Sequence, residues 1–127
     1  MKVSEVMRKP TVECRPDTTL SAAAELMWKR RCGFLPVIGE GGNLIGVITD
    51  HDISVSLSTR PQRPSELFVK DAMPAKLFAC AAGDSIRCAL TTMRIEGLRH
   101  LPVIDREGTL VGVLSLDDIA LHEHAAA

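Results

Sequence analysis

The stretch "LPVIGEGGNLIGVITDHDI" at residues 35–53 returns at residues 101–119 as "LPVIDREGTLVGVLSLDDI". The offset is 66 positions, and the same shift matches the flanking sequence without a gap. Identical pairs at this shift include Val3 with Val69, Met7 with Met73, Cys14 with Cys80, Ala23 with Ala89 and Met27 with Met93. Self-similarity of this extent indicates that the chain contains two copies of one structural unit.

Each copy predicts the same order of elements: a brief strand, a helix, a hairpin of two strands and a second helix. The brief strands are 11–14 and 77–80, and the hairpins turn at 39–43 and 105–109, where glycine allows positive φ. The second helices start near Asp50 and Leu116. Apolar residues at helical spacing predict the first helix of each copy, and Thr18 and Asp84 are the candidate N-caps that precede them. These apolar residues are Leu20, Ala23, Ala24 and Met27, then Ile86, Ala89, Leu90 and Met93.

These elements predict an α/β chain of the α+β kind, made of two β-α-β-β-α repeats. The first repeat covers 1–58, a linker with two prolines covers 59–67, and the second repeat covers 68–127. A unit of about sixty residues buries too small a fraction of its surface to be stable alone. We therefore expect the repeats to pack sheet against sheet with pseudo-two-fold symmetry, which would create a cleft for each repeat.

Composition excludes several classes of function. A net charge of −1 does not favour non-specific attraction to nucleic acid, so no nucleic-acid partner is predicted. No apolar run approaches the roughly 18 residues of a membrane-spanning helix, and the first ten residues are not a secretory signal, so we expect a cytoplasmic protein without direct membrane insertion. The four cysteines form no C-x-x-C pair, and no metal site is predicted. No nucleophile with a placed base and no phosphate-binding loop is recognisable, which argues against an enzyme.

The pattern G-V-x-[TS]-x-x-D ends both hairpins, with Thr49 and Asp52 in the first repeat and Ser115 and Asp118 in the second. A hydroxyl followed three residues later by a carboxylate is typical of a capping box at a helix N-terminus. The same residues suit a ribose-phosphate group, because helix N-termini attract phosphate and a carboxylate accepts from ribose hydroxyls. The pattern alone leaves both interpretations open.

The doubled motifs resemble a tandem pair of cystathionine-β-synthase (CBS) domains, also called a Bateman module. "VSEVM" and "VKDAM" open the two halves, and "LPVI" with "LIGVITDHDI" or "LVGVLSLDDI" closes them, so that the resemblance covers residues 2–122. It implies a regulatory module that binds adenosine-containing ligands between the repeats: AMP, ADP, ATP, S-adenosylmethionine or NAD. It also implies a homodimer, with Trp28 as a candidate contact, and an effector protein that reads the ligand state.

The resemblance also implies roles for individual residues. Asp52 and Asp118 would bind ribose hydroxyls, and Thr49 and Ser115 would contact phosphate. Before "LPVI" the second repeat has Arg99 and His100, where basic residues of the family reach phosphates, whereas the first has Gly33 and Phe34, so we expect two unequal clefts. Purine-lining positions would be Thr11, Val12, Leu35 and Pro36, with Leu77, Phe78, Leu101 and Pro102.

A second function stays open on the sequence. The chain could be a constitutive dimerisation module with a redox response through Cys14 and Cys80, which occupy equivalent positions. Arg99 could equally be a solvated residue at the end of a helix that binds no phosphate.

Overall fold

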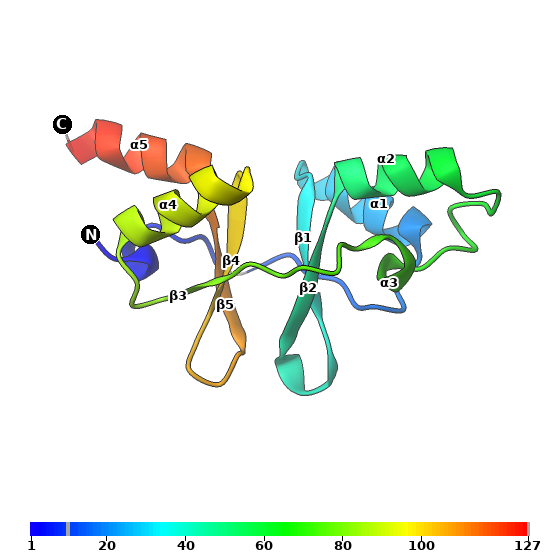
Figure 1. Ribbon diagram of the computed structural model, residues 1–127, viewed down its shortest axis with the longest axis horizontal. Coiled ribbons are helices and arrows are strands. Elements are labelled where there is room, and N and C mark those ends of the chain that lie inside the picture. The colour runs from blue at the N-terminus through cyan, green and yellow to red at the C-terminus, as the bar shows by residue number, and fades with distance from the viewer. Residues whose placement is uncertain (10, 127) are drawn as a thin grey trace. The chain divides into compact units, whose positions relative to one another are not determined.

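The computed structural model describes residues 1–9 and 11–126, with side chains up to residue 123. The chain forms two compact units (Figure 1). We call Val12–Leu77 the central unit, and Met1–Thr11 with Phe78–Ala127 the terminal unit. The chain therefore passes from one unit to the other at residues 11–12 and returns at residues 77–78. Helices and antiparallel strands occur in both units, which confirms the predicted α+β class.

The central unit contains α1 (Leu20–Arg30), β1 (Phe34–Ile38), η2 (Glu40–Gly42), β2 (Leu44–Thr49), α2 (Asp50–Thr59) and α3 (Val69–Ala72). Strands β1 and β2 form an antiparallel hairpin in which Leu35 pairs with Ile48. The predicted brief strand at 11–14 is reduced to a single parallel bridge from Cys14 to Val37. Positive φ at Gly41 and Gly42 closes the hairpin, as the glycine-rich loop predicts.

The terminal unit contains η1 (Val3–Glu5), β3 (Cys80–Ala81), α4 (Ile86–Glu96), β4 (His100–Ile104), β5 (Leu110–Ser115) and α5 (Leu116–Ala126). Its sheet has the order β3-β4-β5, with β3 parallel to β4 and β4 antiparallel to β5. Helices α4 and α5 lie on the same side of this hairpin (Figure 1). The hairpins and the starts of α2 and α5 agree with the sequence prediction.

The predicted N-caps are wrong by one residue. Thr19 caps α1 by accepting from the Ala22 amide at 3.1 Å, and Ser85 caps α4 by accepting from the Cys88 amide at 3.2 Å. The side chain of Thr18 instead accepts from the Arg15 amide, so it closes the turn before the helix. Adjacent polar residues in each copy offer alternative caps, and the side chain that reaches the first helical turn can only be chosen once the preceding turn is fixed.

The opening segment of each repeat packs on the other repeat. In the terminal unit the Val3 amide donates to the Asp84 carbonyl at 2.8 Å. In the central unit the Val69 amide donates to the Thr18 carbonyl, also at 2.8 Å. Val3 and Val69 are fully buried. The boundaries of the compact units, at residues 11–12 and 77–78, therefore differ from those of the sequence repeats. The division into 1–58, 59–67 and 68–127 stays a prediction about the repeats.

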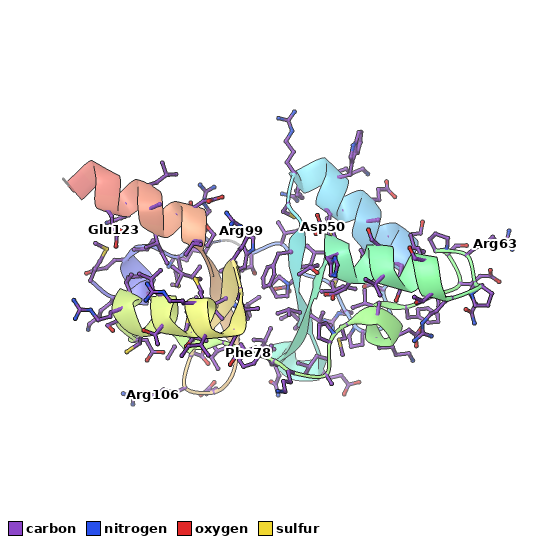
Figure 2. All side chains as sticks on the ribbon, turned by 45° about the horizontal axis from the view of Figure 1, so that its top comes forward. Asp50, Arg63, Phe78, Arg99, Arg106 and Glu123 are labelled. Atoms are coloured by element: carbon purple, nitrogen blue, oxygen red, sulfur yellow. The ribbon has the colours of Figure 1, made fainter. Side chains whose placement is uncertain are left out.

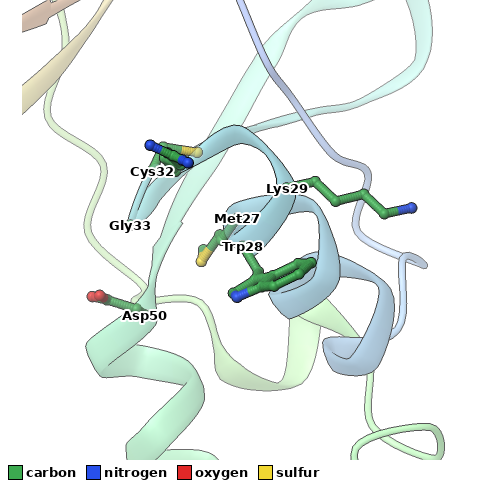
Figure 3. Close-up of a pocket in the computed structure, with 7 residues that line it drawn as sticks. Met27, Trp28, Lys29, Cys32, Gly33 and Asp50 are labelled. Carbon is green, nitrogen blue, oxygen red and sulfur yellow. The ribbon is translucent and has the colours of Figure 1, made fainter.

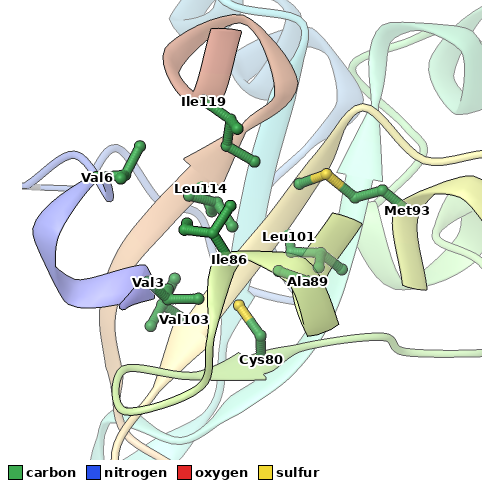
Figure 4. Packing of buried hydrophobic residues seen from close by; sticks show 10 residues of the cluster. All are labelled: Val3, Val6, Cys80, Ile86, Ala89, Met93, Leu101, Val103, Leu114 and Ile119. Carbon is green, nitrogen blue, oxygen red and sulfur yellow. The ribbon is translucent and has the colours of Figure 1, made fainter. Parts of the chain in front are cut away.

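Each unit has its own apolar core, and the two cores use equivalent residues. Figure 4 shows the core of the terminal unit, where Val3 of η1 joins side chains from α4, β4 and β5. Leu101 and Leu114 are fully buried there, as Leu35 and Ile48 are in the central unit. Complete burial of such a side chain stabilises the fold by about 1.5–3 kcal/mol. These cores hold the strand ends, and with them the polar motifs, in fixed positions.

Candidate functional site

The repeated hydroxyl–aspartate motif lies in both units at the junction of a strand and a helix. In the central unit the Thr49 hydroxyl accepts from the Asp52 amide at 3.2 Å. Oδ2 of Asp52 accepts from the Thr49 amide and from its hydroxyl, both at 2.9 Å. These bonds confirm the predicted capping box at the N-terminus of α2.

The terminal unit repeats only part of this arrangement. The Ser115 hydroxyl accepts from the Asp118 amide at 3.0 Å. The Asp118 carboxylate faces Arg8, whose Nε donates to Oδ1 at 2.9 Å and to Oδ2 at 2.8 Å. Asp118 is 14% exposed and Arg8 is 75% exposed. The carboxylate raises the pKa of Arg8 above its ordinary value, first through the hydrogen bond and then through its charge. The two aspartates are therefore in different electrostatic surroundings.

Sequence reasoning missed Arg8. The sequence does contain a difference between the repeats at this position. The 66-residue shift aligns Arg8 with Pro74, directly after the matched pair Met7 and Met73. Only one repeat can therefore supply a cation from this position. Its proximity to Asp118 depends on the packing of the opening segment on the second repeat, which the shift does not reveal.

The glycines of the motif have a structural role. A Cβ atom on Gly46 would lie 2.9 Å from Sδ of Met73, and one on Gly112 would lie 2.7 Å from Sδ of Met7. Such distances are shorter than real contacts of a Cβ atom, so a larger residue in the strand would push the methionine side chain of the opening segment aside. The Gly112 position is the tighter of the two, because the Arg8 carbonyl also lies 3.2 Å from it. These contacts fix the opening segment against the strand that leads to the hydroxyl–aspartate pair.

The residues before β1 and β4 lie next to the helix N-termini. The Asp50 amide donates to the Gly33 carbonyl at 3.0 Å, and the Leu116 amide donates to the Arg99 carbonyl at 2.9 Å. Arg99 projects near the start of α5 (Figure 2), where its Nη2 lies 3.3 Å from Oδ1 of Asp117. In the central unit a Cβ on Gly33 would lie only 2.8 Å from Oδ2 of Asp50. Both positions thus have a carboxylate beside them, but only the terminal unit also has a cation, Arg99, at this place.

The predicted site residues divide between the units. The terminal unit holds Thr11, Phe78, Arg99, His100, Leu101, Pro102, Ser115 and Asp118, and the central unit holds Val12, Leu35, Pro36, Thr49, Asp52 and Leu77. Leu35 and Leu101 are core residues with no exposed surface, so a ligand could meet them only through the backbone. The purine-lining role of these positions stays a prediction.

A hollow of about 660 Å³ lies in the central unit beside Gly33 and Asp50 (Figure 3). It is lined by Met27, Trp28, Lys29, Arg31, Cys32, Gly33 and Asp50. Trp28 is 81% exposed, and none of the residues predicted to bind ligand belongs to the lining. The hollow therefore does not coincide with the hydroxyl–aspartate motif.

All four cysteines are free thiols. Burial raises the pKa of Cys14 to about 11, with the charge of Glu13 adding to it. Burial raises the pKa of Cys80 to about 12, with the charge of Asp84 adding to it. Because the thiolate is the reactive form, both side chains are chemically inert near neutral pH.

No helix among the described residues is long and apolar enough to cross a membrane. The same part of the chain contains no group of three or more histidine, cysteine, aspartate or glutamate side chains arranged to hold a metal ion.

The chain is a tandem repeat of a helix, an antiparallel hairpin and a second helix, with a hydroxyl–aspartate pair at the N-terminus of each second helix. The CBS domain family model matches residues 3–58 and 69–124. The chain therefore belongs to the CBS domain family, as a tandem pair, which confirms the resemblance found in the sequence.

Curated relatives contain this pair within longer chains. An uncharacterized protein, MK0525, of Methanopyrus kandleri is 26% identical over 119 residues, which are 94% of this chain and 61% of that protein. Inosine-5'-monophosphate dehydrogenase of Mycobacterium tuberculosis is 33% identical over 112 residues, 88% of this chain and 20% of that enzyme. The chain thus spans less than two thirds of the length of these relatives.

Solved structures share the fold over nearly the whole chain. The CBS domain pair of MJ0100, in complex with 5'-methylthioadenosine and S-adenosyl-L-methionine, has a TM-score of 0.89 at 20% identity and covers 100% of this chain and 98% of that one. PAE2072 of Pyrobaculum aerophilum, complexed with AMP, has a TM-score of 0.85 at 24% identity, with 100% of both chains covered. Hypoxic Response Protein I, with two coordinated zinc ions, has a TM-score of 0.88 at 28% identity and covers 96% of this chain and 98% of that one.

Proposed function

We propose that the protein is a non-catalytic regulatory module that binds adenosine-containing ligands. The observation that carries this proposal is the presence in both units of a hydroxyl and an aspartate at the N-terminus of the second helix. CBS pairs of the same fold bind AMP, S-adenosylmethionine and methylthioadenosine. Candidate ligands are AMP, ADP, ATP, S-adenosylmethionine and NAD, bound in clefts between the repeats.

Ribose recognition rests on the two aspartates. Oδ2 of Asp52 accepts from the amide and from the hydroxyl of Thr49, and Oδ1 takes part in neither bond, which leaves Oδ1 for ribose hydroxyls. The cap also holds the carboxylate in one orientation, so little conformational entropy is lost when a ligand binds. Thr49 and Ser115 would contact a phosphate at the positive ends of α2 and α5.

Phosphate recognition would differ between the repeats. Arg99 lies beside the start of α5 and offers a permanently charged donor. The first repeat has Gly33 in place of Arg99, and the Asp50 carboxylate beside it would repel a phosphate, whereas the carboxylate beside Arg99, Asp117, is paired with that arginine. We therefore keep the prediction of two unequal sites, with His100 joining Arg99 and the phosphate-bearing ligand favouring the second repeat.

Signalling requires that the ligand bind two conformations of the module with different affinity. An effector protein would then read the conformation or the dimer state, in the cytoplasm. Relatives such as inosine-5'-monophosphate dehydrogenase are enzymes, but this chain matches only 20% of that protein. The hydroxyl–aspartate pairs are explained by capping and ligand binding, with no catalytic step assigned to them.

A thermal-shift panel of AMP, ADP, ATP, S-adenosylmethionine and NAD tests the proposal. A ligand at one hundred times its Kd stabilises the fold by roughly 2.7 kcal/mol, which is a clear rise in Tm. Asp52→Asn and Asp118→Asn should each weaken binding at one site, and Asp17→Asn, at an exposed turn, is the control with the same charge change. Unchanged Tm with every ligand would rule the proposal out.

The proposal includes a homodimer. Trp28 on α1 is 81% exposed, Ile95 on α4 is 72% exposed and Leu121 on α5 is 64% exposed. Contiguous exposed apolar patches mark protein contacts, so these side chains are the candidate contact positions to test for a dimer that the family resemblance implies. Trp28→Lys should shift sedimentation toward a monomer, whereas Asp17→Lys should leave it unchanged. A wild-type monomer at all concentrations would contradict the dimer and leave the ligand sites untouched.

The alternative, a dimerisation module with a redox response, lacks support from the thiols. Cys14 and Cys80 are buried in different units, and burial raises the pKa of both. Neither therefore supplies a thiolate for disulfide exchange near neutral pH.

A further inference from the structure

The two aspartates of the repeated motif differ in their ionic partner. The Nε–H group of Arg8 donates one bifurcated hydrogen bond to the Asp118 carboxylate, with Nε 2.9 Å from Oδ1 and 2.8 Å from Oδ2. The residue that aligns with Arg8 in the other repeat is Pro74, which has no side-chain donor. The Asp52 carboxylate instead turns to its own helix cap. Both oxygens of Asp118 therefore face a guanidinium, whereas Oδ1 of Asp52 takes no part in the helix cap.

The backbone fixes the position of Arg8. Its amide donates to the Val113 carbonyl at 2.9 Å, and its carbonyl accepts from the Val113 amide at 3.1 Å. The neighbouring Met7 packs against Gly112 in the same strand. Arg8 is therefore anchored to β5 two residues before Ser115, and only its side chain is free to leave Asp118. At 75% exposure that side chain can move into solvent without breaking the fold.

We infer that Arg8 is a competing occupant of the ribose site at Asp118. This inference rests on the proposed function. Arg8 contacts both oxygens of Asp118, so a ribose hydroxyl reaches this carboxylate after the guanidinium has moved away. At Asp52 the cap uses Oδ2 only, and a ribose hydroxyl can reach Oδ1 without such a movement. The energy of the ion pair is subtracted from ligand affinity at Asp118, whereas Asp52 carries no such cost. A ligand without phosphates, which gains nothing from Arg99, then fills the two sites in sequence, Asp52 first.

Adenosine is the appropriate probe, because it presents the ribose without a phosphate that would attract Arg8 directly. Calorimetric titration is carried out on Asp52→Asn, which leaves Asp118 as the ribose carboxylate. The same titration on Asp52→Asn with Arg8→Gln should show adenosine binding about three- to fivefold tighter, the range that a half-exposed ion pair supports. High salt should reduce this ratio toward one, because screening weakens the ion pair.

Asp52→Asn with Arg106→Gln is the matched control. Arg106 lies in the exposed turn of the β4–β5 hairpin, away from Arg99 and the start of α5 (Figure 2), and its replacement removes the same charge from the same unit. Its adenosine affinity should equal that of Asp52→Asn alone. Melting curves verify that each variant is folded.

Each outcome has a definite meaning. Unchanged or weaker adenosine binding after Arg8→Gln would overturn the competition. Weaker binding would also show that Arg8 contacts the bound adenosine. In that case adenosine binding to the wild type and to Asp118→Asn would show that the proposed function still holds. Absence of adenosine binding to the wild type and to every variant would overturn the proposed function and the competition together.

Discussion

Sδ of Met7 lies 2.7 Å from the position that a Cβ atom on Gly112 would occupy, although the two residues belong to different sequence repeats. Met73 and Gly46 repeat this relationship at 2.9 Å in the central unit. Both contacts join the opening segment of one repeat to the hairpin of the other. Each repeat therefore keeps a methionine in its opening segment and a glycine in its hairpin, because each packs against its counterpart from the other repeat.

Gly112→Ala should destabilise the protein by about 1–3 kcal/mol, since the added methyl group overpacks the contact with Met7. Gly46→Ala should act in the same direction. Chemical unfolding measures both, and Gly83→Ala is the control because nothing lies within 4 Å of the position that its Cβ atom would occupy. Equal stabilities for Gly112→Ala and Gly83→Ala would show that Met7 moves aside without cost.

The C-cap of α1 carries backbone strain that α4 avoids. Arg31 has φ of 53°, and its equivalent Gly97 has φ of 68°. Left-handed backbone favours glycine, so Arg31→Gly should raise the free energy of unfolding by roughly 0.5–1 kcal/mol. Gly97→Ala should lower it by a similar amount.

The control for Arg31→Gly is Arg30→Gly, one residue earlier and still inside α1. There glycine should destabilise, because Arg30 is the last residue of α1 and keeps helical backbone angles, which glycine adopts at a greater cost in entropy. The opposite signs of two neighbouring arginine-to-glycine changes make the comparison decisive. A loss of stability from Arg31→Gly would show that the arginine side chain contributes more than the strain costs.

The helix caps provide a separate test of local structure. Thr19→Ala and Ser85→Ala should each cost about 1 kcal/mol, since each removes the acceptor for a first-turn amide. Thr18→Ala should be the milder change at the start of α1, because its hydroxyl accepts from a turn amide outside the helix. Urea unfolding of the three variants would reverse this ranking if Thr18 were the true cap.

The buried thiols predict a pH dependence of stability. The pKa of Cys80 is raised from 9.0 to about 12 because burial disfavours its thiolate. Between these values the unfolded chain releases the proton and the folded chain keeps it, so stability is full below pH 9 and falls as pH rises toward 12. Cys80→Ala should flatten this fall in unfolding experiments between pH 8 and 11. The exposed Cys88→Ala variant should retain it, and identical curves for the two variants would contradict the burial argument.

The sequence predicted the hairpins and the starts of α2 and α5 because each depends on neighbouring residues. Short apolar segments between turn residues predict the strands. The spacing of three residues between Thr49 and Asp52 lets each side chain reach the backbone amide of the other, which predicts where the helix begins. Thr18 and Asp84 were incorrect as caps because adjacent polar residues compete for one position. The brief strand at 11–14 was overestimated, since a single bridge to Val37 replaces a ladder.

The 66-residue repeat established two equivalent copies, the α+β class and the family, because apolar spacing and turn residues act locally and occur twice. Folding in three dimensions established which segments share a core: Met1–Thr11 with the second repeat, and Val69–Ala72 with the first. It also brought Arg8 to Asp118 across a separation of 110 residues. Such a contact depends on burying Val3 and Met7 against distant strands, and no local pattern encodes a partner that far along the chain.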